Sequence, residues 1–229
     1  FLTYATHEGR DDHFCRFLRS AANFGVDVRV LNWGGEHRGN GNKLVLTMSA
    51  LSRYDPCTVV FFSDAFDVLY ANTPQQLLDK FLALGVPLVM SAECGCWPQI
   101  SYKNGTAICL GLVDGGYPPS PTQYRFLNTG AYAGRAGTVR HHIQALLNKH
   151  TAEAMAHMCD QEASSNLFLS GTSNISLDYR QELFANLHAA EDFGICNPVR
   201  DLVASDGVIK NQVTGANPGL LHFNGGGGG

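Results

Sequence analysis

The sequence predicts an α/β fold in which a sheet is flanked by helices, and three observations support it. Segments with strand-like spacing of apolar residues alternate four times with segments of helical spacing. One strand-like segment, 58–62, is β-branched and aromatic without any charge, which is typical of a strand buried on both faces of a sheet. The length of 229 residues, of which 45% are hydrophobic, suits a single domain with one substantial core.

The first part of the chain has the pattern of a strand–helix–strand unit followed by a loop and a second helix. The expected elements, in order, are a strand at 1–5, a helix that begins at Asp11 and Asp12 and is stopped by Gly25, a strand at 26–31, a loop at 32–42, a helix that opens at Lys43 and the buried strand at 58–62.

The segment from Thr73 to Gln76 predicts a helix start, because Thr, Pro at the first helical position and Gln three residues after the cap form the pattern of a capping box. Gly85 ends this helix. Further along, we expect a strand at 87–92, a long loop at 93–125, a strand at 126–133, helices through Leu147 and Leu169, and a short strand at 218–222. Residues 183–187 suit either a helix or a bent strand, and both alternatives stay open.

Composition and charge exclude several classes of function. The net charge of -4 and the absence of any Lys/Arg run argue against nucleic acid as a partner. No apolar run approaches the roughly 18 residues of a membrane span, and no signal peptide precedes the first strand. The seven cysteines match no zinc pattern. We expect a domain at 1–224 and the start of a Gly-rich linker at 225–229.

Asp64 and Asp67 directly follow the buried strand at 58–62. A buried strand cannot keep carboxylates inside it, so both acids must emerge at its carboxyl end, where open α/β sheets bind ligands. Two acids three residues apart can point the same way and together hold one hard divalent cation. The alternative is that they cap the turn by accepting hydrogen bonds from nearby backbone N–H groups.

Ten short blocks occur in one order along nearly the whole chain: Ala5-Thr-His-Glu-Gly, Phe17-Leu-Arg-Ser-Ala, Val28-Arg-Val-Leu, Gly41-Asn-Lys, the Asp64/Asp67 block, Thr73-Pro-Gln-Gln-Leu-Leu-Asp-Lys-Phe81, Ser91-Ala-Glu-Cys-Gly-Cys-Trp-Pro98, Phe126-Leu-Asn-Thr-Gly130, Asp160-Gln161 and His222-Phe-Asn-Gly225. In this order they resemble the glycosyltransferase domain of the procollagen lysyl hydroxylases. The resemblance implies a GT-A type glycosyltransferase fold, with a Rossmann-like mixed, mostly parallel sheet flanked by helices, that binds a UDP-sugar with manganese.

The resemblance implies a metal site made by Asp64, Asp67 and His222, with Asp64 also near the ribose. One imidazole among oxygen ligands shifts the preference from magnesium toward Mn2+. Asn224 and Gly225 are expected to bring N–H groups to the diphosphate. Taken alone, His222 would more often be a histidine satisfied within the core than a ligand, but its place at a strand end beside Asn-Gly favours the ligand.

Thr6 and Lys43 resemble the family's nucleotide contacts, and Lys43 stands at an expected helix start, which favours phosphate. Without the resemblance, Lys43 would be taken for a solvated surface lysine. Phe66 lies between the two acids, where the family often has Tyr, and is expected to stack on the uracil. Packing in the core is the alternative for Phe66.

Trp97, Asn128 and Asp160 are expected on the sugar side of the site. Trp97 would line a sugar pocket, Asn128 would bind sugar hydroxyls, and Asp160 would organise sugar and acceptor during transfer. Core packing for Trp97 and helix capping for Asp160 are the alternatives. The sequence departs from the family after Gly225, where glycines follow and the family usually supplies a lysine to the diphosphate.

Together these residues predict a metal-dependent glycosyltransferase that moves a hexose from UDP-glucose or UDP-galactose to a hydroxylated protein or glycan acceptor. By resemblance the acceptor is hydroxylysine, or a sugar linked to it, in a collagen-like protein. The location implied is the secretory pathway lumen, in the endoplasmic reticulum or Golgi, or outside the cell. The alternative is a catalytically degenerate module that binds a UDP-sugar or acts as a scaffold in a larger protein.

Overall fold

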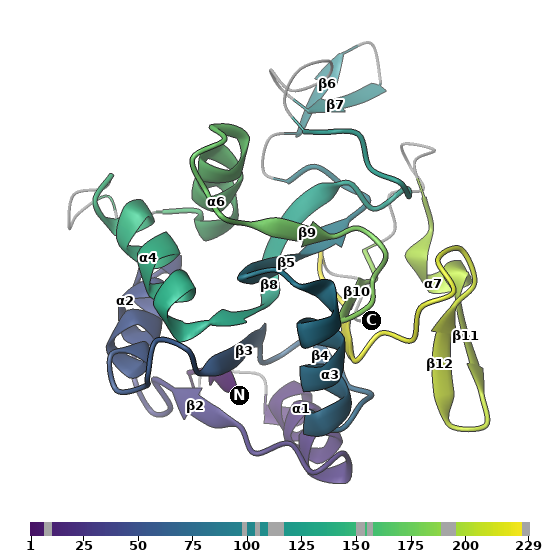
Figure 1. The fold of residues 1–229 in the computed structure, drawn as a ribbon, viewed down its shortest axis with the longest axis horizontal. Helices are drawn as coiled ribbons and strands as arrows, with labels where there is room; N and C mark the ends of the chain where they lie inside the picture. The colour runs from purple at the N-terminus through teal and green to yellow at the C-terminus, as the bar shows by residue number, and fades with distance from the viewer. Residues whose placement is uncertain are drawn as a thin grey trace.

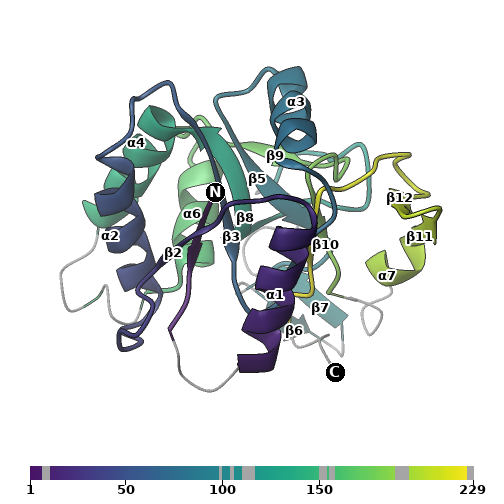
Figure 2. The same cartoon turned by 90° about the horizontal axis from the view of Figure 1, so that it is seen from below.

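The computed structural model describes residues 1–6, 11–97, 100–103, 106–109, 117–149, 154, 158–188 and 196–225. A six-stranded sheet runs through its centre with helices on both faces (Figures 1 and 2). In spatial order its strands are β2 (Arg29–Leu31), β1 (Leu2–Tyr4), β3 (Val59–Asp64), β8 (Phe126–Arg135), β5 (Leu88–Glu93) and β9 (Ser176–Asp178).

The central sheet is mixed and mostly parallel, as predicted. The pairs β1–β2, β1–β3 and β5–β9 are parallel, whereas β8 runs antiparallel to its neighbours β3 and β5. This reversal has a consequence for the site. The amino end of β8 meets the carboxyl ends of β3 and β5, with Ala131 opposite Ser63 and Phe126 opposite Glu93. Residues 128–130 therefore lie at the edge where Asp64 emerges.

Two hydrophobic clusters hold the helices to the sheet. One contains Leu44, Leu51 and Ile143 and joins the sheet to α2, α4 and α6, while the other contains Phe17 and Phe81 and joins it to α1 and α3. Both views show α2 and α4 on one side of the sheet and α1 and α3 on the other (Figures 1 and 2). The helices are α1 (Asp11–Asn23), α2 (Asn40–Leu51), α3 (Pro74–Leu84), α4 (Ala136–Leu147), α6 (Asp160–Leu169) and the short α7 (Pro198–Asp201).

A second, three-stranded sheet brings the end of the chain to the site. It consists of β10 (Phe184–Asn186), β13 (Leu220–His222) and β4 (Val68–Tyr70), with β13 in the middle. Segment 183–187, for which the sequence allowed either a helix or a bent strand, thus contains a strand. His222 on β13 lies opposite Val68 on β4. Because Asp67 directly precedes β4, this pairing delivers His222 to the acids that follow β3.

Local signals explain the boundaries of α3. Thr73 and Gln76 form the predicted capping box, with each side chain bonded to the other's backbone N–H, and Gly85 ends the helix in the left-handed conformation at φ 65°.

The start of α2 differs from the prediction, because the helix begins at Asn40 and not at Lys43. Gly39, at φ 78°, makes the turn into it, and Gly41 is buried within the helix.

Two antiparallel hairpins were not predicted. Strands β6 (Ile100–Lys103) and β7 (Thr106–Cys109) lie within the expected loop at 93–125, and β11 (Leu202–Ser205) pairs with β12 (Val208–Asn211) near the carboxyl end. Strands of four residues carry too little periodic pattern to be recognised. Of the expected linker at 225–229, only Gly225 lies within the described residues.

A disulfide joins Cys94, just after β5, to Cys196, just before α7. Cys96 is also disulfide-bonded, whereas Cys15, Cys57 and Cys159 are free. The spacing of cysteines does not determine their connectivity, so the sequence could not predict this pairing. Among the described residues, none of the helices is both long and apolar enough to cross a bilayer.

Candidate active site

A cavity of about 620 Å³ opens at the carboxyl edge of the central sheet, between β3, β5 and the end of β13. All eleven residues that the sequence assigned to a site line this one cavity, although they come from widely separated parts of the chain. They are Thr6, Lys43, Asp64, Phe66, Asp67, Trp97, Asn128, Asp160, His222, Asn224 and Gly225.

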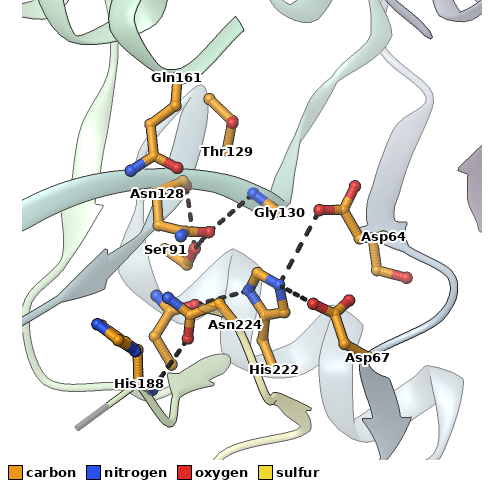
Figure 3. Close-up of polar contacts among 12 residues, drawn as sticks. Asp64, Asp67, Ser91, Asn128, Thr129, Gly130, Gln161, His188, His222 and Asn224 are labelled. Atoms are coloured by element: carbon orange, nitrogen blue, oxygen red, sulfur yellow. Dashed lines mark hydrogen bonds and ion pairs between the residues drawn. The ribbon is translucent and has the colours of Figure 1, made fainter. Parts of the chain in front are cut away.

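Asp64, Asp67 and His222 converge in the cavity wall (Figure 3). Nε2 of His222 lies 3.3 Å from Oδ2 of Asp67 and 4.0 Å from Oδ2 of Asp64, and one ligand atom from each residue lies within 4.8 Å of the others. Two ligands of one ion, at bond lengths of about 2.0 to 2.3 Å, cannot be much farther apart than this. The convergence expected between Asp67 and His222 is confirmed, and the three groups fit a divalent cation.

The orientation of His222 is determined by Asn186, which the sequence did not single out. Nδ2 of Asn186 donates to the carbonyl oxygen of Ala92 over 3.0 Å, so its Oδ1 faces Nδ1 of His222 at 2.8 Å. Nδ1 therefore carries a proton that it donates to Asn186, and this fixes Nε2 in an orientation toward the two acids. Gly130 leaves room for the ring, because a Cβ at this position would overlap Cε1 of His222.

The electrostatics of the three groups are coupled. Burial acts to lower the pKa of His222, but Asp67 and Asp64 outweigh it and raise that pKa. Burial acts to raise the pKa of Asp67, but the hydrogen bond with His222 outweighs it and lowers that pKa. For Asp64, burial raises the pKa against the opposing effects of Lys43 and His222. Asp67 thus stays ionised and offers a negative charge that a cation would neutralise.

Lys43 links Asp64 of this cluster to Asp160. Its ammonium lies 2.7 Å from Oδ2 of Asp160 and 3.3 Å from Oδ1 of Asp64, and its side chain is only 11% exposed. Burial acts to lower the pKa of Lys43, but Asp160 and Asp64 outweigh it and raise that pKa, so the lysine stays charged. Thr129 also donates to Asp160, over 3.2 Å. Asp160 is the first residue of α6, and Cys159 occupies the N-cap position.

Glu93 is a buried carboxylate that the sequence reasoning missed. Asn128 and Gln161 donate to its Oε1 over 3.0 and 2.8 Å, and Asn224 donates to its Oε2 over 2.6 Å. Burial raises the pKa of Glu93 in spite of these donors. The carboxylate therefore ties together β8, α6 and the segment after β13. An apolar strand that ends directly in an acid is the same signal that pointed to Asp64, so the sequence did contain a cue.

The remaining predicted residues differ in how firmly they are held. Thr6 is 6% exposed. The ring of Phe66 packs against that of Phe14, with centroids 6.0 Å apart, so core packing accounts for part of the surface of Phe66. Trp97 is 61% exposed, which removes core packing as its role. The side chain of Asn224, besides its bond to Glu93, accepts from the backbone N–H groups of residues 187 and 188.

Comparison with known proteins agrees with this geometry. Residues 1–227 match the family described as the PLOD GT domain. The chain is 31% identical over 232 residues to procollagen-lysine,2-oxoglutarate 5-dioxygenase of Drosophila melanogaster, covering 93% of this chain and 29% of that protein. It is 30% identical over 238 residues to the human multifunctional procollagen lysine hydroxylase and glycosyltransferase LH3, covering 98% of this chain and 29% of that protein. The chain thus spans less than a third of the length of these relatives.

Among solved structures, the galactosyltransferase LgtC in complex with donor and acceptor sugar analogues is similar in fold. The TM-score is 0.52 at 13% identity, over 98% of this chain and 87% of that one. At this identity the likeness supports the fold alone, and that fold is GT-A. Because the family match extends over nearly the whole length, and because the relatives align over the same length, this chain belongs to the family of PLOD glycosyltransferase domains.

Proposed function

We propose that this chain transfers a hexose from a UDP-sugar to a hydroxyl group of an acceptor, in a reaction that depends on Mn2+. The observation that carries the proposal is the cluster of Asp64, Asp67 and His222 in the wall of the large cavity. Family and fold supply the class of reaction. The donor, the metal and the roles of single residues are inferred from the resemblance to the family together with the chemistry of the cavity.

Asp64, Asp67 and His222 would hold the cation, and the mixture of two carboxylates with one imidazole favours manganese over magnesium. When bound there, the cation would neutralise the charge that develops on the leaving diphosphate. The protein's own part is preorganisation, because Asn186 already aims Nε2 of His222 at the acids.

The nucleotide would lie between Thr6 and Phe66, with the uracil stacked on Phe66 and the diphosphate beside the backbone of Asn224 and Gly225. Lys43 belongs to the same wall. Because its ammonium is engaged by Asp160 and Asp64, Lys43 would act chiefly by holding these two acids in place. This position keeps a metal ligand and a sugar-side acid at a constant separation.

The transferred sugar would lie between Trp97, Asn128 and Asp160. Exposed in the cavity wall, Trp97 offers a flat apolar surface to a sugar ring. Asn128 is anchored by Glu93, and Asp160 by Lys43 and Thr129, so both can direct hydrogen bonds at sugar hydroxyls without further ordering.

The acceptor we propose is hydroxylysine, or a sugar already attached to it, in a collagen-like protein. The names of the relatives refer to procollagen lysine, and this supports the choice. We place the chain in the lumen of the secretory pathway, in the endoplasmic reticulum or Golgi, or outside the cell. A disulfide between Cys94 and Cys196 favours such an oxidising compartment.

Titration calorimetry of UDP tests the site. UDP should bind with Mn2+, more weakly with Mg2+, and not measurably after chelation, and Asp67→Asn should weaken the binding in Mn2+. Release of UDP from UDP-glucose and UDP-galactose, with a hydroxylysine-containing collagen peptide as acceptor, tests the reaction. Undiminished UDP affinity in the metal-free protein would refute the ligand set. UDP binding without any turnover would make the chain a binding module.

A further inference from the structure

His188 lines the same cavity but has no role in the proposal so far. It follows strand β10 by two residues. Because β10 runs parallel to β13 with Asn186 opposite His222, residue 188 comes level with Asn224. The backbone N–H of His188 donates to Oδ1 of Asn224 over 3.1 Å, which fixes its place in the wall (Figure 3).

The imidazole of His188 lies against two glycines, Gly95 and Gly225, and needs the second of them for space. A Cβ at Gly225 would overlap its Nδ1, and a Cβ at Gly95 would lie 3.7 Å from its Cδ2. Gly225 has φ 73°, a conformation that strains other residues. The ring therefore lies directly against the backbone that turns beside the cavity, and only glycine at 225 permits this contact.

The described lining of the cavity has few cationic groups that could donate a hydrogen bond to a phosphate. Its described lining carries four carboxylates, those of Asp64, Asp67, Glu93 and Asp160. Lys43 is the only lysine or arginine among the lining residues that the structure describes, and two of the acids already engage its ammonium. A diphosphate would thus meet a cation at the metal site but no unengaged lysine or arginine of this lining.

We propose that His188 binds the distal phosphate of the nucleoside diphosphate by donating a hydrogen bond from its imidazole. The inference rests on the proposed function, because it takes Gly225 to lie beside the diphosphate. It extends that function by naming a residue that distinguishes a diphosphate from a monophosphate and that stabilises the diphosphate as it leaves.

The test compares UDP with UMP in the presence of Mn2+. His188→Leu removes the donor but fills a similar volume, and it should weaken UDP binding roughly tenfold, the usual effect of losing a hydrogen bond to a charged group. UMP binding should stay within about twofold. His188→Asn keeps an N–H donor and should recover part of the loss. Phe66→Ala is the matched control, because loss of the uracil contact should weaken both nucleotides alike.

Equal losses for UDP and UMP in His188→Leu, or no loss for either, would show that the ring only packs between the glycines. If this variant fails to fold, the imidazole NMR signals of His188 in the wild-type protein decide, recorded with Mg2+ because paramagnetic Mn2+ would broaden them. These signals should shift with UDP and not with UMP, and any other pattern refutes the contact. Failure of the proposed function looks different, because wild-type protein would then not bind UDP in Mn2+ at all, and the role of His188 would be refuted with it.

Discussion

Both ring nitrogens of His222 are committed, one to Asn186 and the other toward Asp67. The contact between His222 and Gly130 leaves no space for a larger residue. The proposed metal site thus depends on Gly130, which contributes no ligand atom, and substitution of Gly130 should disturb metal binding selectively.

We predict that Gly130→Ala will weaken Mn2+ binding at least about tenfold, because the new Cβ displaces the His222 ring, and partners that orient a ligand are worth that much in affinity. Isothermal titration with Mn2+ alone measures this. Gly134→Ala on the same strand is the control, since its Cβ would crowd Val139 and Leu88 in the core. That variant should lose stability and keep its metal affinity; an unchanged affinity in Gly130→Ala would contradict the prediction.

Glu93 offers a second test at the level of one residue. In Glu93→Gln the shape is kept, but an NH2 group must face at least one of the amide donors that now bond to the carboxylate. We expect a loss of about 1–3 kcal/mol in the free energy of unfolding, the cost of an unsatisfied buried polar group. Urea denaturation gives the value, with Glu36→Gln, the same substitution at an exposed position, as the matched control. A change below about 0.5 kcal/mol would mean that Glu93 does not hold this part of the site together.

At the scale of elements, the sequence predicts best where one local pattern decides the structure. The uncharged run before Asp64 predicts β3, and the cap and stop residues of α3 predict its two ends. The direction of β8 could not be predicted in this way, because an alternating pattern of apolar residues is the same in a parallel and an antiparallel strand. Strands of three residues, such as β10, carry too little pattern to be told from a helical turn.

Between α4 and α6, His142 is buried, and its Nε2 lies 3.3 Å from Oγ of Ser164. Burial, together with His141, lowers the pKa of His142 to about 4. At pH 7 the ring is neutral in both folded and unfolded chains. Between about pH 6.5 and 4 only the unfolded chain takes up the proton, so the free energy of unfolding falls as the pH falls.

We predict that this contribution reaches about 3 kcal/mol at pH 4. His142→Gln lacks the titrating group, so the stability advantage of the wild type over the variant should shrink by that amount between pH 7 and pH 4. Urea denaturation of both proteins at several pH values measures it. A difference that does not change with pH would mean that His142 is protonated in the folded protein.

At the scale of the whole molecule, the disulfide between Cys94 and Cys196 closes a loop with a sequence separation of 102 residues. A cross-link over such a loop removes much of the freedom of the unfolded chain, about 4 to 5 kcal/mol in the chain-entropy model. We predict that the double variant Cys94→Ala, Cys196→Ala will lose about 3–5 kcal/mol in the free energy of unfolding without reductant. Cys15→Ala, at an exposed free thiol, should lose almost nothing. Equal stabilities would contradict the prediction.

The sequence could predict residues that line the cavity, but not how the side chains in it are arranged. The resemblance named eleven residues, and all of them line one cavity. It did not name the groups that hold them, such as Asn186 and Glu93, because these act through contacts between distant segments. Nor could it tell that Lys43 is engaged by two acids, since the burial of a lysine depends on which elements pack over it.

The pairing of β4 with β13 joins a strand from the first third of the chain to one near its end. A ribosome releases the chain from its amino end, at about 5–20 residues per second. Asp64 and Asp67 therefore leave the ribosome several seconds or more before His222 can reach them. During that interval the nascent chain exposes two carboxylates without their imidazole, and a metal ion cannot find the complete set of ligands. The proposed cation can therefore meet its full set of ligands only once β13 has been synthesised.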